Sequence, residues 1–275
     1  MTRSTTAAAS SPSGARSQRE PARQRQRIAP PPPHHEVEWR AAWTALRNLI
    51  DDPERTDQVF VLIEALAGNS GERLFQRFLR HPDAHALLLA KPSLLATLSD
   101  RARLEALPVG SFGHEYARFM REGGIEPEGL VEACEERERL REDVADPERE
   151  WFFARLRDMH DLWHVLTGYG RDLAGEDANL AFTWAQTGNR GIGAIVLASL
   201  VLGPKTLDLF WPRYLLRAWR RGRRASLLAA ARYEELFALP LAEVRRRLGV
   251  APPAEAHPGG ILVWNLGDDG FAVVR

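Results

Sequence analysis

Apolar side chains recur at helical spacing along most of the chain that follows residue 36. Between residues 36 and 50, tryptophan, alanine, leucine and isoleucine return every three or four positions, which is the spacing of one helix face. Glycine and proline interrupt the pattern at intervals typical of loops between helices. We therefore expect an all-α fold with a single multi-helix domain. The pattern predicts helices over residues 36–50, 56–66, 74–79, 84–89, 112–120, 150–166, 175–186, 192–202 and 241–248, and one long helix or a helix pair over 212–237.

Both ends of the chain depart from this pattern. Residues 1–33 are rich in serine, alanine, arginine, glutamine and proline, and Glu20 is their only acid. A mitochondrial transit peptide has a similar composition, but it needs an apolar helix face that this stretch lacks, so we favour a disordered tail. Short β-like runs at 261–264 and 271–274 predict a small hairpin. The expected organisation is a disordered tail over 1–35, a helical metal-binding domain over 36–250 and a C-terminal extension over 251–275.

Charge balance and cysteine content narrow the class of protein. The 37 basic and 37 acidic residues give a formal net charge of zero, so we expect no nucleic-acid partner. Cys134 is the only cysteine, which precludes an internal disulfide. It lies in a charged run, so we assign it no zinc-binding or nucleophilic role. We expect a reducing compartment.

Three segments have an environment that the sequence leaves open. The dense charge run over 132–149 is typical of a solvated helix face. The uncharged segment 192–202 is too short to span a membrane and predicts either a buried helix or a segment next to lipid. The arginine-rich segment around Trp219 either faces water or rests on anionic lipid headgroups.

The pattern H-D-x(2)-H-x(11)-E, formed by His160, Asp161, His164 and Glu176, is the strongest candidate for a chemical site. Histidines four residues apart on a helix lie on one face, about 6 Å apart along the axis. Glu176 follows a glycine-punctuated turn, so a second helix can bring its carboxylate to the imidazoles. Such nitrogen and oxygen ligands suit a divalent metal, zinc or iron. Asp161 is either a further ligand or an acceptor that orients an imidazole.

Residues around the motif extend the candidate site. Arg155 and Arg157 precede the motif by one to two turns, and they are candidates for binding a substrate carboxylate or for balancing charge. Trp163 and Tyr169 are candidate walls of the site, whereas His257, in the C-terminal extension, is assigned no role. Two histidines at this spacing also occur by chance, so the motif alone is compatible with an ordinary polar helix face.

Several further motifs follow one another in a characteristic order. Residues 155–168 read Arg-Leu-Arg-Asp-Met-His-Asp-Leu-Trp-His-Val-Leu-Thr-Gly, and Gly175-Glu176 and then Gln-Thr-Gly at 186–188 follow. This order resembles that of the ubiquinone (coenzyme Q) biosynthesis protein four family, and the resemblance extends over about residues 43–250. Other segments that look like the family's lie at 57–68, 107–116, 220–224, 233–236 and 239–241.

The resemblance implies an enzyme of ubiquinone biosynthesis. Similar proteins act on carbon one of a prenylated 4-hydroxybenzoate-type ring, where the carboxylate is lost and a hydroxyl is installed. The resemblance thus implies a metal-dependent decarboxylase, with His160, Asp161, His164 and Glu176 as ligands and catalytic residues. Zinc would serve the decarboxylation as a Lewis acid, and iron would also activate O₂ for a coupled hydroxylation.

The resemblance also implies partners and a location. The expected partners are a prenylated quinone precursor, a membrane surface, other quinone-biosynthesis enzymes and a second copy of the chain in a homodimer. The expected location is cytoplasmic and peripheral to the inner membrane in a bacterium, or on the matrix side of the mitochondrial inner membrane in a eukaryote.

The chain departs from the family pattern after the Gly-Glu pair. Leu180 and Thr183 stand where the family usually has a lysine and a glutamate, and Asp177 and Asn179 are also unusual. These residues put the polarity of the pocket, and hence the substrate, in question. Two alternatives therefore stay open, a non-catalytic prenyl-lipid-binding scaffold and a diverged enzyme for another prenylated or phenolic substrate.

Overall fold

The computed structural model describes residues 30, 36–52, 55–124, 146–202, 209–264 and 272–274. The chain divides into two units, residues 1–30 and 31–275, and every helix described below belongs to the second. The predicted disordered tail lies outside the described residues except for Pro30, and so does the charged run up to residue 145.

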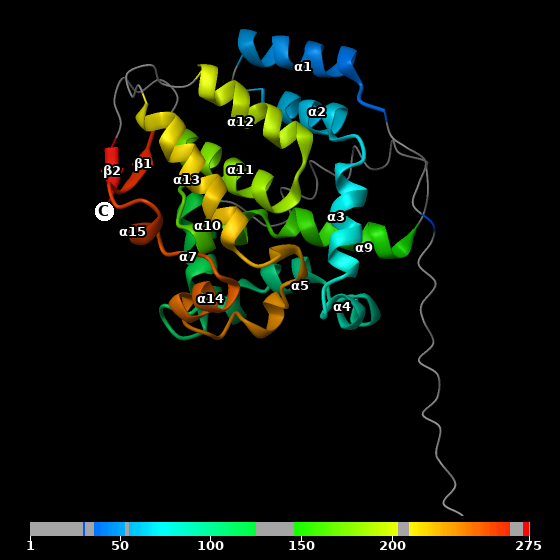
Figure 1. Cartoon of the computed structure of the whole chain (residues 1–275). Coiled ribbons are helices and arrows are strands. Elements are labelled where there is room, and N and C mark those ends of the chain that lie inside the picture. Colours follow the sequence, from blue (N-terminus) through cyan, green and yellow to red (C-terminus); the bar gives the residue numbers. More distant parts are fainter. Residues whose placement is uncertain are drawn as a thin grey trace, which may run out of the picture. The chain divides into compact units, whose positions relative to one another are not determined.

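The N-terminal half of the described chain is a succession of helices joined by short loops (Figure 1). Two of them, α5 and α6, were not expected from the hydrophobic pattern. Each begins at a side-chain cap, because Oγ of Ser93 accepts from the Ala96 amide and Oδ1 of Asp100 accepts from the Arg103 amide. The helices are α1 (Trp39–Asp51), α2 (Thr56–Ala67), α3 (Ser70–Leu79), α4 (Ala84–Ala90), α5 (Leu94–Ser99), α6 (Arg101–Glu105) and α7 (Phe112–Gly123).

The C-terminal half completes the helical domain and adds one antiparallel strand pair, in the place where the sequence predicted a hairpin. The all-α prediction is confirmed, because helices dominate the described residues and these two strands are very short. The elements are α9 (Pro147–Asp158), α10 (His160–Thr167), α11 (Leu173–Thr187), α12 (Arg190–Leu202), α13 (Phe210–Arg224), the 3₁₀ turns η2 (Leu228–Ala230) and η3 (Tyr233–Glu235), α14 (Leu241–Leu248), α15 (Pro253–Ala256), β1 (Ile261–Val263) and β2 (Ala272–Val274).

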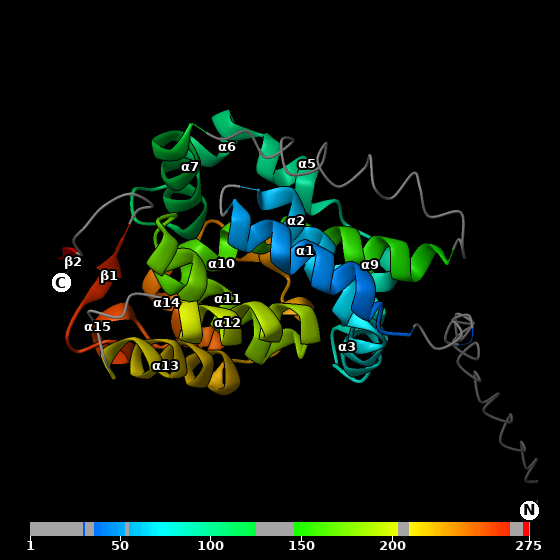
Figure 2. The same ribbon diagram turned by 90° about the horizontal axis from the view of Figure 1, so that it is seen from above.

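Helix α11 lies within the main core, with α12 and α13 packed beside it (Figure 2). Its small residues Ala178 and Ala181 are fully buried together with Phe182. Gly222 allows α13 to approach closely, because a Cβ at that position would collide with the carbonyl oxygen of Phe182. This close packing fixes the helix that presents the carboxylate of the candidate metal site.

Helices α1, α2 and α12 form a second apolar cluster. Ala42 and Ala45 of α1 pack with buried residues of α2, and Ile195 of α12 lies against them. Trp39 and Trp43 of α1 lie outside this cluster and are 73% and 63% exposed. None of the helices in the described ranges has the length and hydropathy needed to cross a membrane.

Helix α12, which covers the segment 192–202, is only partly buried. Ile192 and Val196 are buried in the protein. Leu197 and Val201 point outward and are 53% and 74% exposed. The helix therefore has one side in the core and an apolar side that faces away from it.

Two predicted helices have different limits in the structure. The helix expected over 150–166 is two helices, because the backbone bends at Met159 (φ −78°, ψ −12°) between α9 and α10. No glycine or proline marks this bend in the sequence. The segment expected as a long helix or a helix pair over 212–237 is helical only to Arg224, and 3₁₀ turns follow.

The C-terminal extension packs onto the helical domain. The amide of Trp264 donates to Oδ1 of Asp172 at 2.7 Å, and the carbonyl of Trp264 accepts from the Leu173 amide at the same distance. These two bonds attach the end of β1 to the start of α11. Ile261 and Leu262 are buried in the main core, so this part of the extension contributes to the stability of the domain.

Candidate metal centre

Two adjacent helices bring His160, His164 and Glu176 together. The histidines lie in the first turn and the middle of α10, and Glu176 lies in the first turn of α11. Nε2 of His164 is 3.4 Å from Oε2 of Glu176, and Nε2 of His160 is 3.9 Å from the same oxygen. One ligand atom from each of the three residues lies within 4.8 Å of the others. Helical spacing within α10 and the turn to α11 together create this arrangement.

The turn between the two helices is built from glycine and a capping aspartate. Gly168 ends α10 with a positive φ of 74°, which glycine adopts without steric cost. Asp172 caps α11 by accepting from the amides of Ala174 and Gly175, both at 3.2 Å. A Cβ at Gly175 would collide with the backbone of Gly170. Only a glycine there lets the chain fold back tightly enough for Glu176 to face the imidazoles.

The hydrogen bond of His164 determines which of its nitrogens faces the site. Nδ1 lies 3.2 Å from the carbonyl oxygen of Tyr169, which can only accept, so Nδ1 carries the hydrogen. In the neutral ring, Nε2 then presents a lone pair toward the carboxylate of Glu176. This Nε2 is buried, and apart from Glu176 it has no hydrogen-bond partner. A buried lone pair that faces a carboxylate oxygen is stabilised by a proton or a cation between them.

The distances suit a metal ion of ordinary size. In a tetrahedral site with metal–ligand bonds of about 2.1 Å, neighbouring ligand atoms are about 3.4 Å apart. The His164–Glu176 separation equals this value, and the His160–Glu176 separation is slightly longer. All three ligand atoms lie within 4.8 Å of one another, so two nitrogen ligands and one oxygen ligand converge on a space that suits a divalent cation.

Asp161 lies behind His160 rather than among the three converging ligands. Its Oδ1 is 3.4 Å from Nδ1 of His160, so it can accept the Nδ1 hydrogen and leave Nε2 directed toward Glu176. Burial opposes ionisation of Asp161, but the bond and the charge interaction with His160 hold its pKa below the usual value. The sequence left two roles open for Asp161, a further ligand or an acceptor that orients an imidazole, and this geometry favours the orienting role.

The carboxylate and imidazoles of the site are coupled electrostatically. Burial raises the pKa of Glu176, but the neighbouring His164 and His160 outweigh it and leave the pKa below its usual value. Burial lowers the pKa of His160, but Asp161 and Glu176 outweigh it and leave the pKa raised. The carboxylates are thus ionised at neutral pH, as metal ligands must be.

Arg171, in the turn between the ligands, was not expected as a site residue. Its guanidinium carbon lies 3.6 Å from the centroid of the Phe119 ring, and Nη1 donates to the Phe119 carbonyl at 2.6 Å. Phe119 in turn stacks on His164, with ring centroids 5.6 Å apart. The charge of Arg171 interacts with Asp161 and Glu176, which places a cation beside the three ligands.

Arg155 and Arg157 are engaged elsewhere on α9. The Arg155 guanidinium is buried and donates to both carboxylate oxygens of Glu234, at 2.6 and 2.9 Å. Nε of Arg157 donates to Asp158 at 3.3 Å. Arg155 thus joins α9 to the 3₁₀ turn η3. The role of the two arginines in binding substrate stays a prediction.

Trp163 and Tyr169, the candidate walls, support the site from inside the core. Nε1 of Trp163 donates to Oη of Tyr233 at 3.0 Å. The main chain of Tyr169 holds His164, while its Oη lies 2.8 Å from Nε2 of His257. His257 is therefore a buried supporting residue, although its place near the end of the chain gave no such indication.

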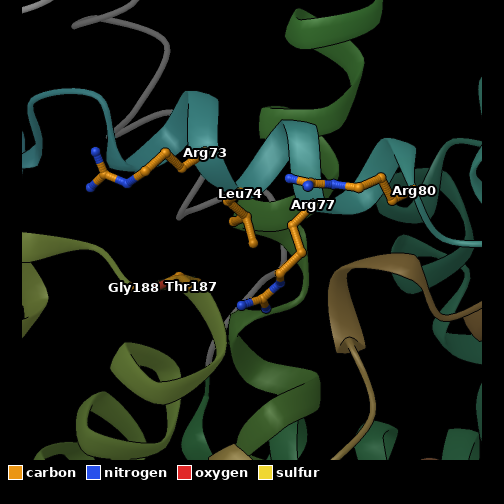
Figure 3. Close-up of a pocket in the computed structure, with 6 residues that line it drawn as sticks. All are labelled: Arg73, Leu74, Arg77, Arg80, Thr187 and Gly188. Carbon is orange, nitrogen blue, oxygen red and sulfur yellow. The ribbon is translucent and has the colours of Figure 1, made fainter.

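A separate cavity of about 490 Å³ lies where α3 meets the end of α11, and none of the candidate ligands lines it. Figure 3 shows Arg73, Arg77 and Arg80 projecting from α3, with Arg77 directed toward Thr187. Nη2 of Arg77 donates to the carbonyl of Gln186, the residue before Thr187. This arginine therefore stabilises the C-terminal end of α11.

Comparisons with known proteins agree on one family. The family described as "Coenzyme Q (ubiquinone) biosynthesis protein Coq4" matches residues 36–254, a range that includes the three candidate ligands. The chain is 31% identical over 207 residues to "Ubiquinone biosynthesis protein COQ4, mitochondrial" of Yarrowia lipolytica, which covers 74% of this chain and 76% of that protein. It is 28% identical over 224 residues to the mitochondrial COQ4 homolog of Rattus norvegicus, which covers 80% of this chain and 78% of that protein.

A solved structure shares the fold. The crystal structure of a protein from Nostoc punctiforme PCC 73102 superposes with a TM-score of 0.56 at 23% sequence identity. The match covers 78% of this chain and 99% of that chain. At this level of identity, the likeness concerns the fold.

Proposed function

The chain belongs to the family of the coenzyme Q (ubiquinone) biosynthesis protein Coq4, and on that premise we propose that it is a metal-dependent decarboxylase of a prenylated 4-hydroxybenzoate-type precursor. One observation carries the proposal. The buried Nε2 of His164 lies 3.4 Å from Oε2 of Glu176 and contacts no other hydrogen-bond partner, and this geometry is satisfied by a cation. When bound at His160, His164 and Glu176, a divalent metal supplies a Lewis acid, and iron in addition supplies O₂ activation.

The charges around the site suit a carboxylate substrate. A divalent cation, Glu176, Asp161 and Arg171 sum to a single positive charge, which one benzoate carboxylate neutralises. Arg171 has donor capacity for it, because its Nε has no hydrogen-bond acceptor and its Nη atoms donate to a carbonyl and to Sδ of Met120, not to a carboxylate. We assign Arg171 the role of binding the substrate carboxylate.

Gly123 of α7 makes room for Arg171. A Cβ at Gly123 would overlap the guanidinium group, while the side chain of Phe119 supports it from the same helix. The guanidinium is thus held in one place by α7, and it is ordered before substrate binds. Pre-ordering lowers the entropic cost of binding an anion at this position.

The reaction needs little from the protein beyond placement and electrostatics. Decarboxylation breaks the bond between ring carbon one and the carboxylate, CO₂ leaves, and the ring carbon keeps the electron pair and takes up a proton. The para-hydroxyl makes that carbon electron-rich, which favours the protonation. A coupled hydroxylation replaces the proton with a hydroxyl, and it requires O₂ together with two electrons from a reductant.

The apolar outer surface offers a place for a prenyl tail and a membrane. Trp39 and Trp43 of α1 are strongly exposed, as are Leu197 and Val201 of α12 and Leu209 at the start of α13. Helices α1 and α12 share one apolar cluster, so their exposed residues belong to one part of the domain. Such aromatic and aliphatic side chains insert readily into the interface of a bilayer. We propose that this part of the domain rests on the membrane that holds the substrate.

Metal analysis of the purified protein, combined with mass spectrometry of co-purified lipid, tests the proposal. The expected result is a divalent metal together with a prenylated phenolic acid or its product. Protein that is metal-free and remains inactive after reconstitution contradicts it. Normal quinone levels in cells whose protein carries His160→Ala would support the scaffold alternative.

A further inference from the structure

A second cavity lies between α13, α14 and α15, next to the C-terminal end of α10. Its volume is about 600 Å³. Six arginines line it, whereas Glu255 is the only acidic residue among its lining residues. The arginines are Arg217, Arg220, Arg221, Arg224, Arg245 and Arg246.

Most of this positive charge is uncompensated. Arg246 is paired with both carboxylate oxygens of Glu243, at 2.7 and 2.8 Å. Within the described ranges, none of the other five arginines forms an ion pair with a carboxylate. Guanidinium groups gathered without acids repel one another, and a bound anion removes that repulsion.

Arg221 is the innermost of these arginines and is only partly satisfied. It is 3% exposed, and its Nη1 donates to the carbonyl of Thr167 at 2.6 Å. Its guanidinium lies 5.3 Å from the centroid of the Tyr169 ring, and Nε and Nη2 are buried without a hydrogen-bond acceptor in normal geometry. A buried guanidinium without a paired anion is costly, so an anionic ligand that offsets its charge gains affinity.

Arg245 lies close to Arg221 and has the same attachment to α10. Its Nε donates to the Leu166 carbonyl at 2.8 Å, and its Nη2 donates to the Val165 carbonyl at 3.1 Å. Burial and the charge of Arg221 lower the pKa of Arg245 to about 10. The guanidinium is still protonated at neutral pH, so two like charges persist side by side in the protein.

We propose that this cavity binds a phosphate or diphosphate group. Arginine donors match phosphate oxygens in pairs, and a dianion or trianion balances several guanidinium groups at once, which a single carboxylate does not. Arg217, Arg220 and Arg224 lie at i, i+3 and i+7 on α13, so they share one helix face with room for such a group. The group belongs either to a soluble phosphate ester or to the headgroup of a phospholipid.

The cavity is linked to the candidate metal centre through α10. Arg221 and Arg245 hold the last three carbonyls of the helix that carries His160 and His164. A phosphate that binds these two guanidinium groups acts on the C-terminal end of this helix. Phosphate binding and metal binding are then expected to be coupled, by the same factor in both directions.

Titration calorimetry of the full chain with sodium pyrophosphate tests the site without reference to any reaction. The test variant replaces the three exposed arginines that line the cavity, as Arg217→Gln, Arg220→Gln and Arg224→Gln. The matched control replaces Arg213→Gln and Arg223→Gln, which are exposed on the same helix but do not line the cavity. We expect the test variant to bind at least tenfold more weakly and the control to stay within twofold of the wild type.

Vesicles that contain phosphatidylglycerol separate the two sources of phosphate. If pyrophosphate binds the protein but does not release the protein from the vesicles, the natural ligand of the cavity is a soluble phosphate ester. If pyrophosphate releases the protein from the vesicles, the ligand is a lipid headgroup. Both results support the proposal. Wild-type protein that shows no heat of binding and no rise in melting temperature with pyrophosphate contradicts it. Equal losses in the test variant and the control also contradict it.

Discussion

Nε2 of His164 and Oε2 of Glu176 lie 3.4 Å apart, although they belong to different helices. The carbonyl of Tyr169 accepts from Nδ1 of His164, so the buried Nε2 of the neutral ring presents a lone pair toward Glu176. The two helices therefore meet through a pair of atoms that a cation stabilises. Metal binding and the stability of the domain should be coupled as a consequence.

We predict that added zinc or iron(II) raises the melting temperature of the wild type. At a free metal concentration of a thousand times the dissociation constant, the gain in unfolding free energy is about 4 kcal/mol. His164→Ala and Glu176→Gln should abolish most of this gain, because each removes a ligand. His85→Ala, at an exposed position on α4, is the matched control and should behave as the wild type. An equal metal-induced shift in all four proteins would exclude this site.

The Asp161→Asn variant distinguishes an orienting role of Asp161 from a role as a metal ligand. If Asp161 orients His160 through Nδ1, its loss should weaken metal binding about 10- to 100-fold while the metal stoichiometry stays unchanged. His160→Ala should lower the stoichiometry itself. Competition with a fluorescent chelator measures both quantities. Loss of stoichiometric metal in Asp161→Asn would instead assign Asp161 as a direct ligand.

Arg171→Gln should impair recognition of the substrate carboxylate. We expect binding of a prenylated 4-hydroxybenzoate to weaken about 10- to 100-fold, since a charge-assisted contact is worth about 1.5–3 kcal/mol. Binding of the matching neutral amide should be unchanged. Gly123→Ala should act in the same direction, because its Cβ displaces the guanidinium while leaving the charge in the chain.

Arg121→Gln is the control for the Arg171 and Gly123 variants. Arg121 is exposed on α7, the helix that carries Gly123, and it pairs with Glu105. Equal weakening of the acid and the amide in Arg171→Gln would show that Arg171 only supports the packing of Phe119. Metal content should be measured in parallel, so that a loss of the site is not mistaken for a loss of recognition.

His257 should make folding stability depend on pH in mildly acidic solution. Burial, followed by the charges of Arg221 and Arg217, lowers its pKa from 6.5 to about 3. The unfolded chain therefore takes up a proton below pH 6.5 that the folded protein does not, so stability falls as pH falls from 6.5 toward 3. The slope from this residue is about 1.4 kcal/mol per pH unit. Chemical unfolding of His257→Asn at several pH values should show a shallower slope than the wild type, and exposed His85→Asn should not.

Trp39→Ser and Trp43→Ser should weaken association with vesicles. Each exposed indole that enters the membrane contributes about 1.5 kcal/mol, so each change should lower the partition coefficient roughly tenfold. Val109→Ser, at a position that is 87% exposed before α7, should have no effect. Flotation with liposomes measures the three variants together. Unchanged flotation of both tryptophan variants would show that the membrane-facing surface lies elsewhere on the domain.

The helical periodicity of the sequence predicted the fold well because most helices bury one apolar side. It failed where tertiary packing decides the local backbone. The bend at Met159 between α9 and α10 has no glycine or proline to announce it. The segment after Arg224 keeps its apolar residues buried in 3₁₀ turns, and periodicity alone could not tell these from a continuing helix.

The candidate site was predictable to the extent that its residues are close in sequence or belong to one motif. His160, His164 and Glu176 could be chosen from spacing. Arg171 could not, because its environment depends on Phe119, which lies far back in the chain on α7. In the same way, nothing near Arg155 in sequence indicated its pairing with Glu234.

The release of labelled CO₂ tests the central claim most directly. Metal-loaded wild-type protein and Glu176→Gln are given a prenylated 4-hydroxybenzoate that carries ¹³C in its carboxyl group, with O₂ and a reductant present in one arm and absent in another. We predict labelled CO₂ from the wild type in at least one arm, and a loss of a hundredfold or more in Glu176→Gln. Wild-type protein that holds both metal and substrate, yet releases no labelled CO₂ in either arm, would contradict the account.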